Sequence, residues 1–409
     1  MSAARRVAGL AKYLSRLGYR VTVLTSMLSG SGPVEGAHRV VRTRDLMTSR
    51  LNWRRGSFQS LSGQVGVAYE SRPSRVASVI VPDVELIGWL PFALFRALGL
   101  AASADCVITS SPPRSVHLAG LASRARAVPW IADFRDGWRF DDARPGYPAA
   151  AQDQLDALLE RTLVRRADAV TAVSAPIAED LRERLGVDAE TITNGFDPDE
   201  LGTTDLDGWQ PPVAPDRHSL VYTGSLAYAG RTPEPLLAGI RQLRRDAPEL
   251  AERLEVVFAG PLSGAEREAI EQDDLDGITR ALGSLPRERA LALQSAADSL
   301  LLIADDRRTS MATGKLYEYL AAAKPILVLG VGTAAARTVS EAGAGIVVSS
   351  DDPVRIAGAL RELLDAAATR ADASAVQRFS YAELARDMAA VVERVCESRS
   401  RAGGKALEA

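Results

Sequence analysis

Short apolar runs alternate with amphipathic stretches along this chain, and that alternation is the feature that most constrains its fold. In the first half the runs are separated by helical patterns such as 152–166 and 176–185. They are mostly continuous in apolar residues, which is typical of parallel strands covered by helices on both faces. The runs are YRVTVLTS, ASVIVPD, ADCVITSS, PWIADFRD, ADAVTAVS and ETITNGF.

A proline-rich stretch interrupts this rhythm. Residues 206–219, LDGWQPPVAPDRHS, predict a linker between domains, after which LVYTGSL, LEVVFAG, DSLLLIA, PILVLG and AGIVVSS resume the pattern. A chain of 409 residues also exceeds one ordinary core. We therefore predict an α/β protein of two facing Rossmann-like, doubly wound domains with a cleft between them, the first over 1–205 and the second over 220–375.

Composition narrows the classes of function. Apolar residues make up 46% and charged residues 25%, as in globular proteins. Lys plus Arg number 49 and Asp plus Glu 52, so the net charge of -3 gives no overall attraction to nucleic acid. The two cysteines, Cys106 and Cys396, are too few and too far apart in sequence to suggest a disulfide or a metal cluster. The start, MSAARRVAGLAKYL, lacks the order of a signal peptide, so we expect a reducing cytoplasm.

The most apolar stretch is 84–102, VELIGWLPFALFRALGLAA. It carries Glu85 and Arg96 and is interrupted by Pro91, which disfavours a membrane span. Two interpretations stay open for it. It is a buried or half-buried helix, or it lies on the inner face of a membrane as a peripheral contact.

Candidate ligand-binding residues follow the apolar runs, because ligands of open parallel sheets bind beyond the carboxyl ends of the strands. In the second half, Gly224 and Ser225 follow the first run and Gly260 follows the next. Arg231 stands at the entrance of a helix predicted to begin near Thr232 or Pro233. Glycines at such turns let a ligand approach the backbone.

The stretch TGKLYEYLAAA predicts a helix with Thr313 as its N-cap and Gly314 in its first turn. Backbone N–H groups at a helix start attract phosphate oxygens. The chain has only four lysines, and one of them, Lys315, adds a mobile charge here that suits a diphosphate. Glu318 lies on the same helix face and is placed to accept hydrogen bonds from ribose hydroxyls. The alternative is a surface ion pair between Lys315 and Glu318.

Charged residues also follow PWIA in the first half, where Asp133, Arg135 and Asp136 stand close together. One interpretation is that Arg135 bridges the two Asp residues and holds a turn. The other is a ligand contact through Arg135 or Asp136. His117, in PPRSVHLAG, is more often a packed helix residue than an acid or base, and we keep it as a minor acceptor-side candidate.

Several motifs in this order resemble one known family. The second half contains YTGSL, GSLPRERALALQSAADSLLLI, TGKLYEYLAAAKPILVLG and EAGAGIVV, and the first contains RRVAGLAKYLSRLGYRVTVLT, SSPPRSVHLAG, WIADFRDGW and TITNGFDPDEL. Together they resemble the family 4 retaining glycosyltransferases, of the group 1 type, which have the GT-B architecture. The resemblance implies transfer of a sugar from a nucleoside diphosphate sugar, with retention of configuration and without a metal or cofactor. The acceptor would be a glycan, a lipid-linked sugar or a small metabolite.

The resemblance also implies roles for single residues. Glu318 matches the second Glu of the family's E-x7-E motif, which binds ribose, while the first Glu is replaced by Ser310. Lys315 would take over part of that role. Arg231 matches the second member of a basic pair that stabilises the leaving diphosphate, and Ser225 replaces the first.

The first-domain motif ADFRDGW matches the acceptor-side catalytic loop of the family. Asp133, Arg135 and Asp136 are therefore candidates for contacts to the transferred sugar or the acceptor hydroxyl. The resemblance further implies that a last helix, over 376–398, crosses back to the first domain, and a disordered tail would follow over 399–409.

One part of the family pattern does not appear before RRVAGLAKYLSRLG, namely a first strand and a Gly-Gly loop. Either the start at Met1 is assigned too late, or the first domain tolerates the gap. Ser310, Ser225 and the missing loop also support a different function, a non-catalytic relic that binds a nucleotide or a partner. A sugar-nucleotide epimerase on the same fold is the second alternative. The Arg-rich, Ala-rich composition is typical of a high-GC bacterium.

Overall fold

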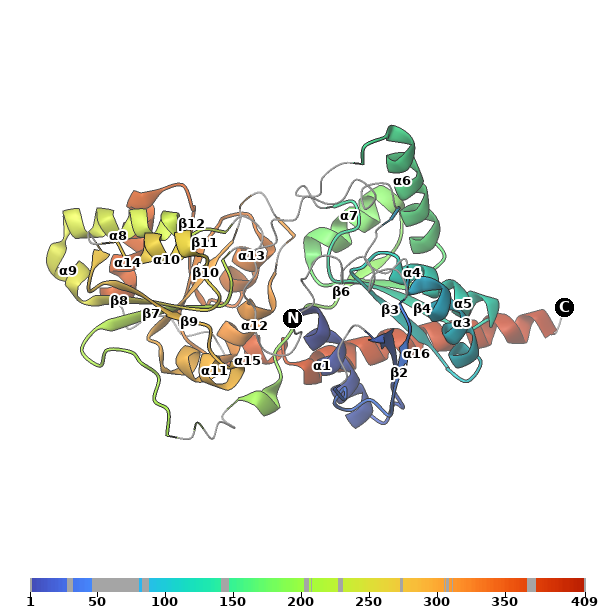
Figure 1. Ribbon diagram of the computed structural model, residues 1–409. Coiled ribbons are helices and arrows are strands. Elements are labelled where there is room, and N and C mark those ends of the chain that lie inside the picture. Colours follow the sequence, from blue (N-terminus) through green and yellow to red (C-terminus); the bar gives the residue numbers. More distant parts are fainter. Residues whose placement is uncertain are drawn as a thin grey trace. The chain divides into compact units, whose positions relative to one another are not determined.

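The chain folds into two compact units in the computed structural model (Figure 1). Unit 1 comprises Met1–Asn194 and Tyr381–Ala409, and unit 2 comprises Gly195–Ser380. The structure describes residues 2–27, 32–45, 81–82, 88–140, 147–201, 206, 208–226, 231–272, 275–304, 306, 309–310, 312–365 and 373–407.

Unit 2 is built on a parallel sheet with the strand order β12-β11-β10-β7-β8-β9. Its strands are β7 (His218–Thr223), β8 (Leu254–Ala259), β9 (Thr279–Gly283), β10 (Ser299–Ile303), β11 (Ile326–Leu329) and β12 (Gly345–Val348). Its helices are η3 (Pro198–Glu200), α8 (Glu234–Asp246), α9 (Pro248–Glu252), α10 (Gly264–Ile270), α11 (Arg287–Ala296), α12 (Gly314–Ala321), α13 (Ala334–Glu341), α14 (Pro353–Asp365) and α15 (Ala373–Gln377).

Both faces of this sheet are buried, as the continuous apolar runs predict. Along β8, Val256 and Phe258 point into one core, while Val257 between them belongs to the core on the other face. Helices α8 and α14 cover the first face, and α12 and α13 contribute to the second core. Side chains of neighbouring positions in a strand alternate between the faces, so consecutive positions of such a strand are mostly apolar.

Unit 1 has the same general construction. Four of its strands form a parallel sheet in the order β3-β4-β5-β6, and β1 pairs with β2 in a separate parallel sheet. The strands are β1 (Thr22–Ser26), β2 (Arg39–Thr43), β3 (Val107–Ser111), β4 (Trp130–Phe134), β5 (Ala169–Ala172) and β6 (Ala189–Thr191). The helices are α1 (Ser2–Arg16), α3 (Leu90–Ala101), α4 (Val116–Ala119), α5 (Leu121–Ala125), α6 (Ala150–Val164), α7 (Ala175–Leu185) and α16 (Tyr381–Leu407).

Two layers of helices enclose the β3–β6 sheet. Trp130 and Phe134 of β4 pack into a core with α6 and α7, whereas Ile131 packs into a second core with α1 and α16. Helices α1 and α16 therefore lie side by side on one face of the sheet, as Figure 1 shows.

Helix α7 illustrates how local sequence sets the two ends of a helix. It has a proline in its first turn, and its C-cap is Gly186, which lies in the left-handed region at φ 66°.

The predicted α/β class and two-domain organisation are confirmed. The sequence patterns did not identify β2 and β9, whose sequences RVVRT and TRALG carry charged residues, as strands at a sheet edge often do. We predicted a single sheet for unit 1, but its described strands form two sheets, because no backbone hydrogen bonds among them join β1 to β3. Most of the predicted strand ASVIVPD, at 77–83, lies outside the described residues.

The compact units end at other residues than the sequence-based domains. Residues 195–201 lie with unit 2, because Phe196 packs in its core and pairs with Ser380 in an isolated parallel bridge. Strand β7 begins at His218, within the stretch 206–219 predicted as a linker.

The closing helix is longer than expected. Helix α16 begins at Tyr381 rather than at 376, and it continues to Leu407 through most of the tail predicted to be disordered. An i,i+4 ion pair between Glu397 and Arg401 supports this last part of the helix. Among the described helices, none combines the length and the apolar character that crossing a membrane requires.

Candidate functional site

The strand order of unit 2 has one reversal point, and it lies beside β7. The chain proceeds from β7 to β8 and β9 on one side, and then returns to β10, β11 and β12 on the other. Loops that leave neighbouring strands in opposite directions open a crevice at such a point. Gly224 and Ser225 follow β7 there, and the segment after β10 leads to the start of α12.

Two glycines bring three segments together beyond the ends of β7 and β8. Gly224 has φ 109°, and its N–H donates to the carbonyl of Ala259 at 2.6 Å. A Cβ atom at Gly224 would lie 2.3 Å from Cε of Lys315, and one at Gly260 would lie 2.2 Å from the carbonyl oxygen of Gly224. Only glycine fits at these positions, so the predicted residues Gly224, Gly260 and Lys315 do meet in one place.

Lys315 is held there by an aromatic residue that the sequence analysis did not single out. Its Nζ donates to the Tyr222 hydroxyl at 2.9 Å and lies 4.4 Å from the centre of that ring. The Tyr222 hydroxyl in turn donates to the carbonyl of Ser225 at 2.8 Å. The only sequence signal was the position of Tyr222 in YTGSL, two residues before Gly224.

A second cation acts on Lys315. Burial and the positive charge of Arg231 lower the pKa of Lys315 to about 7, although Glu318 acts in the opposite direction. Arg231 is itself only 7% exposed. Two basic side chains thus share a poorly hydrated place, where an anion would relieve their mutual repulsion.

The start of α12 adds neutral hydrogen-bond donors. Thr313 is the N-cap, with φ -71° and ψ 154°, as the sequence predicts. Its side chain makes no capping bond, and its buried Oγ1 has no hydrogen-bond partner among the described residues. Gly314 begins the helix, and Ser310 is a half-buried turn residue ahead of it. The hydroxyl and the first N–H groups of α12 are therefore available donors for an anion.

Glu318 is hydrogen-bonded to an arginine of another helix, which the alternative of a Lys315–Glu318 surface pair did not include. Its Oε1 accepts a hydrogen bond of 2.9 Å from Nη1 of Arg287, and Arg287 also pairs with Glu200. The Glu318 side chain is 14% exposed. Arg287 opens α11, and the sequence analysis quoted it only as part of a longer motif. It holds the carboxylate that we expected to meet a ribose.

In unit 1, Asp133 is a buried anchor. Its carboxylate accepts hydrogen bonds from Nε and Nη2 of Arg6 at 3.0 and 2.7 Å, from Ser110 at 2.6 Å and from Thr171 at 2.8 Å. Asp133 is 1% exposed and Arg6 0%. These four bonds occupy both oxygens, so Asp133 holds α1 to the sheet and is not exposed for the acceptor-side contact we expected.

The arginine that is hydrogen-bonded to Asp133 is Arg6. Arg135 is half-buried and its guanidinium donates to the carbonyls of Ser111, at 3.0 Å, and Pro112. Asp136 is exposed at the next position. Arg135 and Asp136 are thus the accessible members of the predicted acceptor-side group.

His117 is a neutral packed residue. Trp130 Nε1 donates to Thr109 Oγ1 at 2.8 Å, and the Thr109 hydroxyl is also hydrogen-bonded to Nδ1 of His117 at 2.8 Å. The ring lies 4.5 Å from that of Phe134. Burial lowers the pKa of His117 to about 3, although Asp133 opposes this. His117 is therefore neutral near neutral pH, as expected of a packed helix residue.

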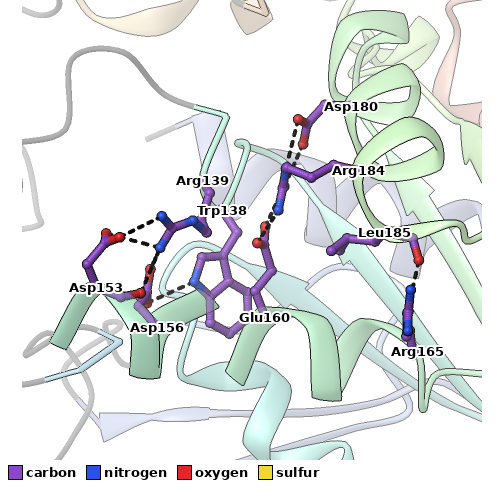
Figure 2. A network of polar contacts seen from close by, with 9 residues as sticks. All are labelled: Trp138, Arg139, Asp153, Asp156, Glu160, Arg165, Asp180, Arg184 and Leu185. Atoms are coloured by element: carbon purple, nitrogen blue, oxygen red, sulfur yellow. Dashed lines mark hydrogen bonds and ion pairs between the residues drawn. The ribbon is translucent and has the colours of Figure 1, made fainter. Parts of the chain in front are cut away.

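Figure 2 shows how the loop after β4 is fastened to α6, and how α6 is fastened to α7. Trp138 Nε1 donates to Asp156 at 3.0 Å, and Arg139 donates to Asp153 at 2.9 Å. Farther along α6, the buried Glu160 pairs with Arg184 of α7 at 2.5 Å. The loop that carries Arg135 and Asp136 therefore begins and ends on rigid elements. In the described part of the chain, no three His, Cys, Asp or Glu side chains are grouped as a metal site requires.

Comparisons with known proteins cover both units. A family model described as a glycosyl transferase 4-like domain matches residues 3–195, and one described as glycosyl transferases group 1 matches residues 221–366. No curated protein matches the sequence at a significant level.

Three solved structures illustrate the fold. The sucrose-phosphate synthase of Thermosynechococcus elongatus has a TM-score of 0.64 at 16% identity, over 96% of this chain and 93% of its own. A UDP-forming α,α-trehalose-phosphate synthase of Burkholderia xenovorans has a TM-score of 0.60 at 13% identity, over 92% and 99%. A structure named as a UDP-N-acetylglucosamine 2-epimerase of Listeria monocytogenes has a TM-score of 0.54 at 14% identity, over 97% and 94%. At these identities the likeness concerns the fold alone.

Proposed function

Because the chain belongs to the GT-B glycosyltransferases with a 4-like first domain and a group 1 second domain, we propose that it uses a nucleoside diphosphate sugar. It transfers the sugar to an acceptor hydroxyl with retention of configuration, and it needs neither a metal nor a cofactor. The Burkholderia xenovorans structure is named as UDP-forming, which is compatible with a nucleoside diphosphate product here.

The meeting of Lys315 with Gly224 at the start of α12 is the observation that carries this proposal. A lysine that is desolvated and lies near Arg231 is unfavourable unless an anion binds beside it. A diphosphate at this place would accept from Lys315, from Arg231, from the Thr313 hydroxyl and from the first N–H groups of α12. Glu318, one turn further along α12, would then accept hydrogen bonds from the ribose.

In the proposed reaction, the bond between the anomeric carbon and the diphosphate oxygen breaks as the acceptor oxygen bonds to the same carbon. Negative charge develops on the leaving diphosphate, where Lys315 and Arg231 neutralise it. The acceptor's proton passes to a diphosphate oxygen, so no carboxylate pair at glycosidase spacing is needed. Arg135 and Asp136 are our candidates for acceptor-side contacts.

We place the reaction in the cytoplasm, and at the inner face of the membrane if the acceptor is lipid-linked. Helix α3 supports the second case, because Phe95 is 80% exposed on it. An exposed aromatic side chain beside Arg96 suits a membrane surface better than water.

Nucleotide binding tests the donor site directly. We expect UDP, GDP, ADP or dTDP to raise the unfolding temperature, and we expect one of them to do so more than the rest. Glu318→Ala and Lys315→Ala should both abolish the shift, because they remove the ribose and phosphate contacts. Differential scanning fluorimetry over a concentration series gives the comparison.

The same experiment, followed by product analysis, separates the alternative functions. A nucleotide shift without release of nucleoside diphosphate from any sugar donor would favour a binding relic. Conversion of the donor to an epimer without an acceptor would favour an epimerase. No shift with any nucleotide, in folded protein, would contradict the proposed donor site.

Arg287 should affect the affinity for the nucleotide through Glu318, without a nucleotide contact of its own. Arg287→Ala removes the 2.9 Å hydrogen bond that holds the Glu318 carboxylate, so the affinity for the preferred nucleotide should fall about 10-fold or more. Calorimetric titration measures this loss. Arg287→Lys should restore part of the affinity. Arg289→Ala is the matched control. Arg289 lies on the same helix as Arg287 but packs over the ring of Trp209, so its loss should not lower the nucleotide affinity. Equal affinities in Arg287→Ala and the wild type would show that Glu318 needs no such support.

A further inference from the structure

The chain's two cysteines meet in unit 1, contrary to the expectation from their distance in sequence. Cys106 immediately precedes β3, and Cys396 lies on α16. The Sγ atom of Cys396 is 3.5 Å from the carbonyl oxygen of Asp105, the neighbour of Cys106. The Cys106 and Cys396 side chains also lie close enough to influence each other's pKa, and both pack against the same core. They meet because α16 packs against the sheet of unit 1.

The surroundings of the pair make its oxidation slow. Both cysteines are half-buried, and both pack at the margin of the core formed by α1 and α16. Burial, together with the nearby acidic groups Asp105 and Asp168, raises the pKa of Cys106 to about 12, and burial also raises that of Cys396. The two thiols therefore stay protonated and reduced near neutral pH in the absence of an oxidant.

We infer that Cys106 and Cys396 form a redox-sensitive pair, which peroxide closes into an intramolecular disulfide between α16 and the start of β3. Cys396, on the outer helix, reacts first, and its sulfur takes one oxygen from hydrogen peroxide to give a sulfenic acid and water. The Cys106 sulfur then attacks the Cys396 sulfur and a second water leaves. The two thiols lose two electrons and two protons in total, and the peroxide is reduced to two waters.

The disulfide would fasten α16 to unit 1. Helix α16 begins directly after the last residue of unit 2, Ser380, and its packing on α1 and the sheet is otherwise non-covalent. Closing a loop of about 290 residues, from Cys106 to Cys396, restricts the unfolded state strongly. Oxidation should therefore raise the unfolding temperature by several degrees. This inference does not depend on the proposed sugar transfer.

The test uses the full chain, treated with hydrogen peroxide in its folded state and then alkylated under denaturing conditions. Mass spectrometry should show a monomer that has lost two hydrogen atoms, takes up no alkylating agent and contains a linked Cys106–Cys396 peptide. Dithiothreitol should restore two alkylatable thiols and the original unfolding temperature.

Single-cysteine variants are the matched controls. Cys106→Ser and Cys396→Ser should fold as the reduced wild type does and should gain no thermal stability on oxidation. If one serine variant misfolds, the corresponding alanine variant serves in its place, and the peptide map of the wild type does not depend on either. Two free thiols after treatment, sulfinic acids in place of the linked peptide, or cross-links only between chains would each overturn the inference.

Discussion

Replacement of Lys315 by alanine should lower kcat for transfer from the preferred nucleoside diphosphate sugar by about 10² to 10³-fold. The reason is its place beside Gly224 and near Arg231, where the charge of a departing diphosphate develops in the proposed reaction. Steady-state kinetics with the donor found by the nucleotide test measures the effect. Lys324→Ala is the matched control, because Lys324 follows the other end of α12, and kcat should not change.

The same lysine should give binding a distinctive pH dependence. Burial and the charge of Arg231 lower the pKa of Lys315 to about 7, against the effect of Glu318, so its ammonium is lost above neutral pH. Nucleoside diphosphates stay fully ionised in that range, since their last pKa is about 6. Affinity should therefore fall by up to about 10-fold for each pH unit above 7.

Lys315→Arg distinguishes this explanation from a general effect of pH. A guanidinium stays charged throughout, so the fall in affinity should be absent from the variant whatever its affinity at neutral pH. A flat profile for the wild type up to about pH 9 would contradict the role of Lys315 charge. A kcat for Lys315→Ala equal to that of the wild type would contradict its place in the transfer itself.

Arg6→Ala should destabilise unit 1 by about 3–5 kcal/mol, because it leaves the buried carboxylate of Asp133 without its counter-ion. Burial alone would raise the pKa of Asp133, but Arg6, Ser110 and Thr171 lower it below its usual value. The contribution of the Arg6–Asp133 pair to the free energy of unfolding is thus present at neutral pH. It is lost as the pH falls below about 4, through the lowered pKa of Asp133. Chemical denaturation at pH 7, followed through a unit 1 signal, measures the loss.

Two comparisons make the Arg6 test specific. The Arg401–Glu397 pair on α16 is mostly exposed, so Arg401→Ala should cost at most about 1 kcal/mol. Arg6→Met combined with Asp133→Leu should be less destabilising than the sum of the single changes, since the double variant leaves no buried charge unpaired. A loss as small for Arg6→Ala as for Arg401→Ala would show that the buried pair contributes little.

The candidate site was predictable in part. The elements of the candidate donor site depend on local sequence, since Gly224 and Gly260 follow apolar strands and Thr313 is the N-cap of α12. We could also expect these elements to lie close together, because the carboxyl ends of parallel strands share one edge of the sheet. Arg287 could not be selected in this way, because nothing near it in sequence indicates that its guanidinium reaches Glu318 on another helix.

The amino-acid sequence by itself determined the α/β class, the two-domain organisation and the places of the candidate donor-site residues at strand ends and at the start of α12. Each of these depends on hydrophobic periodicity, on caps or on turns, which are set by residues close together in the chain. Only the tertiary structure decided that Lys315 rests on Tyr222, that Arg6 neutralises Asp133 and that Cys106 meets Cys396. Those pairings join distant segments, and their geometry exists only once the helices and strands have packed.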